Sequence, residues 1–225
     1  MKIIALIPFW LDYKSLKNSL TCRSLVKISG KSLISRAVEI TNHVGLIDKT
    51  VVFTSNSKAL DYIDDNVNCE FVQRSGDLDS DQTSIEDIID GFLKTSDVDI
   101  IVLIHPKSPF IKPTTIEDCI KKVLTGGFDS AFIANNIKKH AWYKGKPLNY
   151  STYGDTPALS ELEPVLIESS SIYVFKRTLF EKNRHRIGDN PYIKEVGHFE
   201  GFEVDNKDDL TMAELMINAG LDKEI

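Results

Sequence analysis

Two acidic residues near the C-terminus, Glu203 and Asp205, are spaced so that one cation could bind both. They flank Val204, and residues two apart in a strand point to the same face. Adjacent carboxylates repel each other unless a cation lies between them, and oxygen ligands of this kind suit Mg²⁺ bridged to phosphate oxygens. We therefore predict a short strand over residues 202–205 that carries a magnesium site. An acidic turn before a final helix is the alternative reading.

A second group of polar residues follows the most hydrophobic run of the chain, residues 99–105. His105, Lys107 and Ser108 are interleaved with Pro106 and Pro109, and the two prolines stiffen the turn that presents them. A histidine at the end of a strand can equally be a hydrogen-bonded structural residue. We consider the three side chains candidates for substrate binding.

The segment between Pro8 and Lys31 is a third candidate, because it concentrates positive charge in an acidic chain. A loop of this kind can wrap a triphosphate, and a solvated surface loop is the alternative. Neither GxxxxGK[ST] nor GxGxxG is present, so the sequence indicates neither a Walker loop nor a dinucleotide fingerprint. The cations of the segment are Lys14, Lys17, Arg23, Lys27 and Lys31.

Strands and helices alternate in the pattern that would position these groups. Unbroken apolar runs predict buried strands, and segments of helical period lie between them, which indicates a three-layer α/β fold: a mostly parallel sheet with helices on both faces. Ligands bind at the carboxyl ends of strands in such sheets. Thr83 or Ser84 is predicted to cap the second helix and Thr114 the third, with Glu117 and Asp118 on the favourable side of its dipole. The predicted strands are 3–7, 50–54, 99–105, 129–134 and 170–175; the predicted helices begin near 32, 85, 116 and 209.

Residues 135–164 interrupt this order. The segment is polar, with little periodicity, and carries Trp142, Tyr143, Tyr150 and Tyr153. A stretch of this length in a compact domain is usually a functional excursion or an oligomer contact. We predict one domain over residues 1–225, with this segment as an inserted subregion that forms a dimer contact.

Composition narrows the functional classes. The chain has 27 Lys and Arg against 33 Asp and Glu, a net charge of −6, which argues against binding to nucleic acid or to an anionic membrane. Cys22, Cys69 and Cys119 form no CxxC pair, so neither a disulfide framework nor a zinc site is indicated. The apolar N-terminal stretch is too short to span a bilayer. We expect a cytoplasmic enzyme or binding domain.

The sequence resembles the acylneuraminate cytidylyltransferases and is similar to the CMP-Kdo synthetases. This resemblance implies a Rossmann-like nucleotidyltransferase fold, Mg²⁺ as cofactor, and transfer of CMP from CTP to a sialic-acid-like sugar acid with release of pyrophosphate. It also implies a homodimer in which residues 135–164 reach over the partner's active site. The matching segments are IALIP, SGKSLI, QRSGDLDSDQTS, IHPKSPF, DSAF, ESSSIYVF and EVDNKDDL, in chain order.

The resemblance also implies roles for individual residues. The catalytic residues would be Lys14, Arg23 and Asp205; the nucleotide would contact Pro8, Lys14, Ser15, Arg23, Arg74, Asp81 and Ser84; the acceptor would contact His105, Lys107, Ser108 and Tyr173; and Mg²⁺ would be held by Glu203 and Asp205.

Departures from the family pattern bear on the substrate. Residues 9–15 (FWLDYKS) lack the arginine and glycines that embrace the triphosphate, Lys107 replaces a threonine, and Ser169 and Ser170 replace Asn-Gly. The extra charge of Lys107 favours an acceptor more anionic than a plain sugar acid, such as a phosphonate or a phosphorylated acid. A binding protein that has lost catalysis, or an enzyme for another nucleoside triphosphate, are the alternatives.

Overall fold

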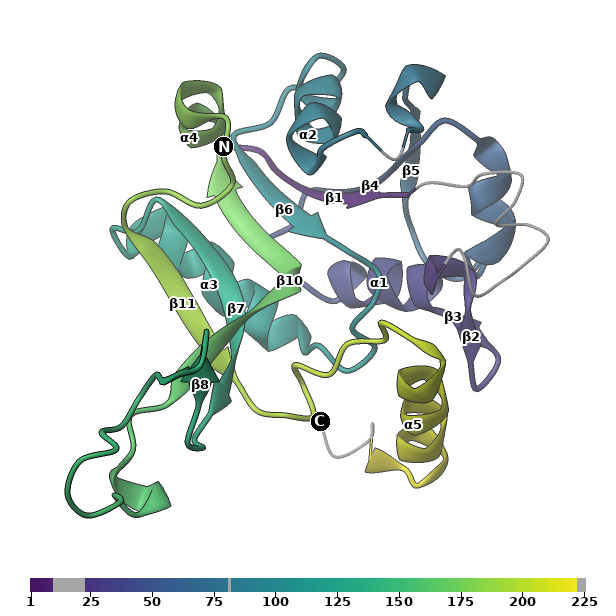
Figure 1. The fold of residues 1–225 in the computed structure, drawn as a ribbon. Helices are drawn as coiled ribbons and strands as arrows, with labels where there is room; N and C mark the ends of the chain where they lie inside the picture. The colour runs from purple at the N-terminus through teal and green to yellow at the C-terminus, as the bar shows by residue number, and fades with distance from the viewer. Residues whose placement is uncertain (10–22, 81, 222–225) are drawn as a thin grey trace.

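A seven-stranded sheet forms the centre of the computed structural model, which describes residues 1–9, 23–80 and 82–221. Its strand order is β11-β7-β10-β6-β1-β4-β5 (Figure 1). Among these strands β10 alone runs antiparallel to its neighbours, β6 and β7, so the prediction of a mostly parallel sheet is confirmed. The strands are β1 (Ile3–Pro8), β4 (Lys49–Thr54), β5 (Glu70–Gln73), β6 (Ile100–Ile104), β7 (Ser130–Ile137), β10 (Val165–Lys176) and β11 (Pro191–Val196).

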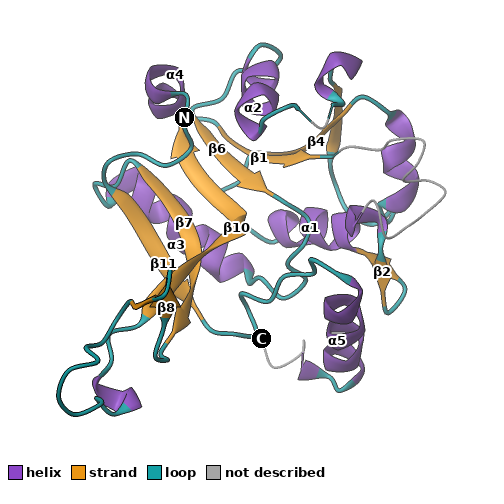
Figure 2. Ribbon diagram, viewed as in Figure 1, coloured by secondary structure: helices purple, strands orange, loops and turns teal. Residues whose placement is uncertain are grey.

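Helices cover both faces of the sheet because alternate strand residues point to opposite sides. In β1, Ile3, Ala5 and Ile7 face one apolar cluster, to which α1 (Leu33–Asn42) and α3 (Pro113–Thr125) contribute. Ile4 and Leu6 face the other, to which α2 (Ile85–Leu93) and α4 (Arg177–Asn183) contribute (Figure 2). The predicted three-layer arrangement is confirmed.

A smaller apolar cluster attaches the C-terminal helix, α5 (Lys207–Asn218), to the rest of the molecule. Ala213 of α5 packs with Ile28, Leu33, Phe110 and Val204. Ile28 belongs to a small hairpin of β2 (Lys27–Ile28) and β3 (Lys31–Ser32). Short 3₁₀ helices lie at η1 (Arg23–Leu25), η2 (Ser57–Tyr62), η3 (Gly76–Leu78) and η4 (Leu159–Glu161).

Side-chain caps fix the starts of α1, α2 and α5 but not those of α3 and α4. Ser84 caps α2 in a reciprocal capping box with Asp87, as predicted. The prediction of a Thr114 cap is wrong: α3 begins after Lys112, with Pro113 at its first position and no side-chain cap. Proline supplies the helical φ and lacks the N–H that a cap would satisfy, so the helix starts earlier. Consequently Glu117 and Asp118 lie beyond its first turn.

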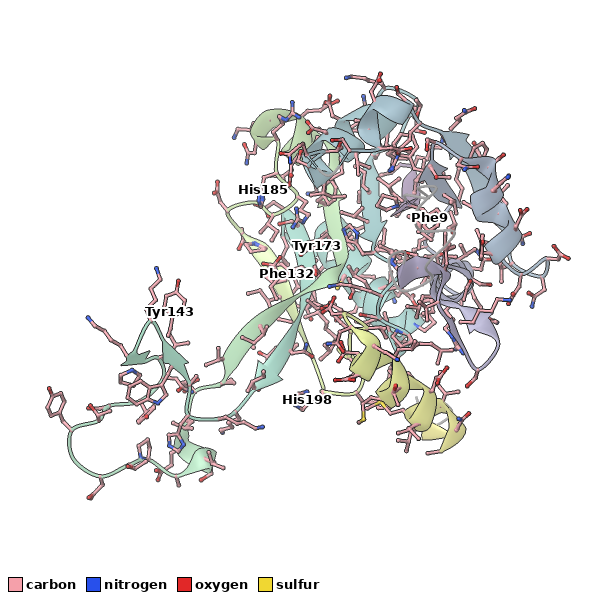
Figure 3. The ribbon with its side chains drawn as sticks, turned by 45° about the vertical axis from the view of Figure 1, so that its right-hand side comes forward. Phe9, Phe132, Tyr143, Tyr173, His185 and His198 are labelled. Carbon is pink, nitrogen blue, oxygen red and sulfur yellow. The ribbon has the colours of Figure 1, made fainter. Side chains whose placement is uncertain are left out.

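The segment between β7 and β10 forms an arm that projects from the sheet (Figure 3). Its base is a paired extension of the two strands, with Ile137 opposite Val165 and Ala134 opposite Glu168. A hairpin of β8 (Trp142–Tyr143) and β9 (Lys146–Pro147) lies further out. Large apolar side chains are exposed along the arm, namely Trp142, Tyr143, Leu148, Tyr153, Leu159, Leu166 and Ile167.

No helix within the described residues is both long enough and apolar enough to cross a membrane.

Candidate functional site

The carboxyl ends of four parallel strands, β5, β4, β1 and β6, form one edge of the sheet. From β1 the chain proceeds outward to β4 and β5, then returns to place β6 on the other side of β1. Strand order reverses at this point, and open α/β sheets bind their ligands in the crevice outside such a reversal. Pro8 ends β1 and His105 follows β6, so these positions border the expected crevice.

The turn after β6 is tied to two distant segments of the chain. The His105 N–H donates to Ser171 O in β10 (2.9 Å), and the Lys107 N–H donates to His105 O (2.8 Å). The Lys107 carbonyl accepts from the N–H of Val204 (2.8 Å). The proline-flanked turn therefore brings the acidic C-terminal segment against β6 through main-chain bonds.

A bulge in β10 supplies three hydroxyl groups to the same place. The register with β7 shifts between Glu168 and Tyr173, over the run Ser169–Ser171. A bulge reorients side chains that a regular strand would send to alternate faces. Ser169 and Ser171 both donate to Glu203 Oε1, at 2.5 and 2.7 Å, while Ser170 Oγ lies 2.5 Å from Lys107 Nζ.

The Glu203 carboxylate is fully engaged by this network. Its second oxygen accepts from Lys107 Nζ at 2.9 Å, and both side chains are only 18% exposed. Ser108 donates to Ser171, whose own proton is given to Glu203. Partial burial acts to raise the pKa of Glu203, but the hydrogen bonds from Ser169, Lys107 and Ser171 outweigh it, so its pKa is lowered.

Asp205 lies on the solvent side of the same ammonium group. Its Oδ1 is 3.8 Å from Lys107 Nζ, and its side chain is 49% exposed. The prediction of a strand over residues 202–205 is wrong, because the segment has no regular secondary structure. Val204 is buried in the small apolar cluster that attaches α5, and the capping box of Asn206 and Asp209 starts that helix directly afterwards. The two carboxylates nevertheless meet at one cation, Lys107.

The two acidic residues differ in their suitability for Mg²⁺. Glu203 does not fit, because both of its oxygens are engaged and an ammonium group lies where a shared ion would bind. Asp205 fits better, since it is half exposed beside the turn after β6 and Mg²⁺ commonly binds one carboxylate together with substrate phosphates and waters. Within the described residues, no three His, Cys, Asp or Glu side chains gather into a metal-binding group.

His105 is uncharged at neutral pH. Removal from bulk water, together with the charges of Arg186 and Lys107, lowers its pKa from 6.5 to about 4, against the opposing effect of Glu203. A neutral imidazole can donate one hydrogen bond and accept another, so it suits a polar acceptor without adding charge.

Tyr173 is buried, beside Phe132 (Figure 3). Its hydroxyl donates to Glu168 at 2.5 Å, and the Arg186 guanidinium lies 4.3 Å from the ring centre. Burial and the bond to Glu168 raise the pKa of Tyr173 to about 12, so the phenol stays protonated. Arg186 also pairs with Glu86 at 2.9 Å.

Arg74 is buried at the end of β5, bound to Asp79 through Nε (3.0 Å) and Nη2 (2.6 Å). It lies three strands from His105, roughly 14 Å at ordinary strand spacing. A hollow of about 490 Å³ opens beside it, between β5 and α2. Its lining holds Asp77, Asp87 and Asp90 against Lys94 and Arg74, and Arg74 is already bound to Asp79, so this hollow does not suit a triphosphate.

The sequence profile of the cytidylyltransferase family matches residues 20–158, more than half of the chain. This chain belongs to the cytidylyltransferase family. The match begins within the first loop and ends before Glu203 and Asp205.

Solved structures share the fold of this cytidylyltransferase. A CMP:2-keto-3-deoxy-manno-octonic acid synthetase complexed with CTP has a TM-score of 0.74 and 16% identity, covering 98% of this chain and 100% of its own. A 4-diphosphocytidyl-2C-methyl-D-erythritol synthase from Anaerococcus prevotii DSM 20548 has a TM-score of 0.62 and 13% identity, covering 96% of each chain. The bifunctional IspDF from Campylobacter jejuni has a TM-score of 0.64 and 11% identity, covering 94% of this chain and 54% of its own.

Several predicted site residues of the cytidylyltransferase fall outside the network around Lys107. Lys14, Ser15 and Asp81 lie outside the described residues. Arg23 begins η1, and only its backbone is described. Ser84 is engaged as the cap of α2, and its role toward the nucleotide stays a prediction.

Ser169, Ser171 and Arg186 are the described residues that sequence reasoning missed. The triple serine run was visible, but only its replacement of Asn-Gly was noted; a polar run next to a predicted strand also signals a bulge. Arg186 lies 13 positions after Tyr173 in a polar segment, and no local sequence pattern marks it as a neighbour of Tyr173.

Proposed function

We propose that this cytidylyltransferase transfers the cytidylyl group of CTP to a small acidic acceptor and releases pyrophosphate. One observation carries the proposal: Asp205 lies beside the Lys107 ammonium at the carboxyl end of β6, next to β1, where a sheet of this topology binds its ligand. Family membership supplies the reaction class.

In this mechanism an acceptor oxygen attacks the α-phosphorus of CTP and pyrophosphate leaves. Such transfers require positioning and charge stabilisation more than covalent chemistry from the protein. We assign Asp205 as the carboxylate that holds Mg²⁺ together with the phosphates. When bound, the ion would neutralise charge that develops on the phosphate oxygens. Lys107, fixed by Glu203 and Ser170, holds Asp205 and the turn after β6 in place.

The acceptor is proposed to bind beside His105; Tyr173 does not contact it as expected, because its ring is fully buried and its hydroxyl is bound to Glu168. The Lys107 charge is balanced by Glu203 within the protein, so it no longer argues for an acceptor of extra negative charge. Arg186 contacts the Tyr173 ring and its charge acts on His105, but Glu86 balances that charge in the same way, so neither cation favours one kind of anionic acceptor. A carboxylate-bearing sugar acid is therefore as well suited as a phosphonate.

We further propose a homodimer that forms through the arm. Exposed aromatic and aliphatic side chains on a projecting segment lose contact with water on association, which favours a dimer. Multi-angle light scattering of the wild type should give twice the monomer mass. The paired substitution Trp142→Ser and Tyr143→Ser should reduce this mass, whereas a persistent dimer would contradict the assignment of the arm.

The decisive experiment is a pyrophosphate-release screen. CTP, ATP, GTP and UTP are each combined with a panel of sugar acids and phosphonates, with and without Mg²⁺. Release with CTP, one acceptor class and Mg²⁺ supports the proposal. Preference for another nucleotide would reassign the donor, and calorimetric binding of CTP without release for any acceptor would favour a binding protein.

A further inference from the structure

Glu203 is surrounded on both oxygens by groups that belong to the protein. Oε1 accepts two serine hydroxyls and Oε2 accepts the Lys107 ammonium at 2.9 Å. A divalent ion that bound Glu203 would have to displace at least one of these donors. Mg²⁺ requires near-ideal octahedral oxygen ligands and parts with water reluctantly, so it competes poorly for a carboxylate already satisfied in this way.

Lys107 cannot move away from Glu203 freely, because it is held at three points. Its carbonyl accepts from Val204, directly between the two acidic residues, and its Nζ contacts Ser170 Oγ as well as Glu203. Val204 is itself buried in the small apolar cluster that attaches α5. The ammonium group is therefore built into the site by the fold, unlike the end of a mobile surface lysine.

We propose that the Lys107 ammonium replaces a divalent cation at the acidic pair. Lys107 contributes one positive charge between Glu203 and Asp205, at 2.9 and 3.8 Å, where the acidic pair alone would attract a metal ion. In the absence of CTP the pair then binds no divalent ion. Asp205 alone recruits one, and only together with the triphosphate; this last statement rests on the proposed function.

The test uses Mn²⁺ as a probe, followed by the electron paramagnetic resonance signal of the free ion, with the full-length protein and no nucleotide. Wild type is expected to leave Mn²⁺ free. Lys107→Met removes the charge while keeping the length of the side chain, so Mn²⁺ affinity should rise by about tenfold or more. Lys194→Met is the matched control, since it breaks another lysine–carboxylate pair (Asp118, 2.8 Å) away from the crevice and should leave Mn²⁺ free.

Tight Mn²⁺ binding by the wild type without CTP, lost in Glu203→Gln, would overturn the proposal. So would equal gains in Lys107→Met and Lys194→Met, because the effect would then be one of overall charge. If Lys107→Met fails to fold by circular dichroism, Glu203→Gln decides: unchanged Mn²⁺ binding with CTP supports the proposal, and a loss refutes it. Failure to bind CTP would contradict the proposed function while leaving the nucleotide-free measurements valid.

Discussion

Two cation–carboxylate groups lie along the same edge of the sheet, at the ends of β5 and β6, and they differ in what surrounds them. At β5, the Arg74 side chain is 1% exposed and Asp79 is 19% exposed, and Nε and Nη2 of Arg74 both donate to Asp79 Oδ1. At β6, one lysine is shared between two carboxylates, one half exposed, within a set of serine hydroxyls.

We interpret the Arg74–Asp79 pair as structural and the group around Lys107 as part of the proposed reaction site. Asp79 accepts two N–H groups of Arg74 on Oδ1 and the Ser55 hydroxyl on Oδ2, so these bonds fix the position of η3 relative to β5. Lys107 is shared between Glu203, which is 18% exposed, and Asp205, which is 49% exposed. Because Asp205 faces solvent, a ligand can bind it while Lys107 stays paired with Glu203. Four predictions test this contrast.

The largest effect is expected from Asp205→Ala. Turnover with CTP and acceptor should fall by about a hundredfold or more, because the proposed phosphate-side ligand is lost. The free energy of unfolding in urea should change little, since the side chain is half exposed. Asp208→Ala, on the first turn of α5, is the control and should keep normal turnover. Normal turnover of Asp205→Ala would remove this residue from the mechanism.

Arg74→Ala should act in the opposite way, on stability. It leaves a partly buried Asp79 without its cation and removes the buried arginine side chain, so the free energy of unfolding should fall by about 3 kcal/mol. The matched variant Arg177→Ala breaks the more exposed pair with Glu181 and should cost no more than about 1 kcal/mol. Equal losses in the two variants would show that burial of Arg74 contributes nothing.

His105 should make the protein less stable in mild acid. Its folded pKa, about 4, lies below the ordinary 6.5, so between these values the unfolded chain binds a proton that the folded chain does not. Stability is therefore full above pH 6.5 and falls as pH decreases toward 4, by at most about 3 kcal/mol. Urea unfolding across this range checks the slope. His105→Gln should flatten it, whereas the exposed His198→Gln should not.

The smallest effect is the coupling between Lys107 and Glu203. A double-mutant cycle of Lys107→Met and Glu203→Gln should give a coupling free energy of about 1–2 kcal/mol in urea unfolding, because both groups are largely removed from water. The same cycle on Arg177 and Glu181 should give about 0.3–0.5 kcal/mol. Similar couplings would mean that the ammonium is screened by solvent.

The sheet and its helices could be predicted because their signals are local. Unbroken runs such as residues 100–104 are fully buried, and the capping box of Ser84 and Asp87 is encoded within four residues. The partners of Glu203 could not be predicted in this way. Lys107 is 96 positions away and Ser169 is 34, and their meeting depends on a bulge and on a buried valine rather than on any spacing.

Residues 202–205 were predicted to bring two carboxylates together as a strand, and the structure brings them together in another way. Strand alternation would place Glu203 and Asp205 on one face. In the structure the segment is irregular, and the bond from the Val204 N–H to the Lys107 carbonyl brings both carboxylates to Lys107. The two carboxylates therefore lie together as expected, the fold places Lys107 between them, and their chemical role stays a prediction.

β10 joins the arm to the residues around Glu203. Within its 12 residues, one continuous stretch of backbone carries the root of the arm at Val165–Glu168, the hydroxyls that grip Glu203, and the core residue Tyr173. A subunit that bound the arm would contact the same strand whose serines bind the Glu203 carboxylate. The proposed dimer would therefore link subunit association to the position of Glu203 through a single strand.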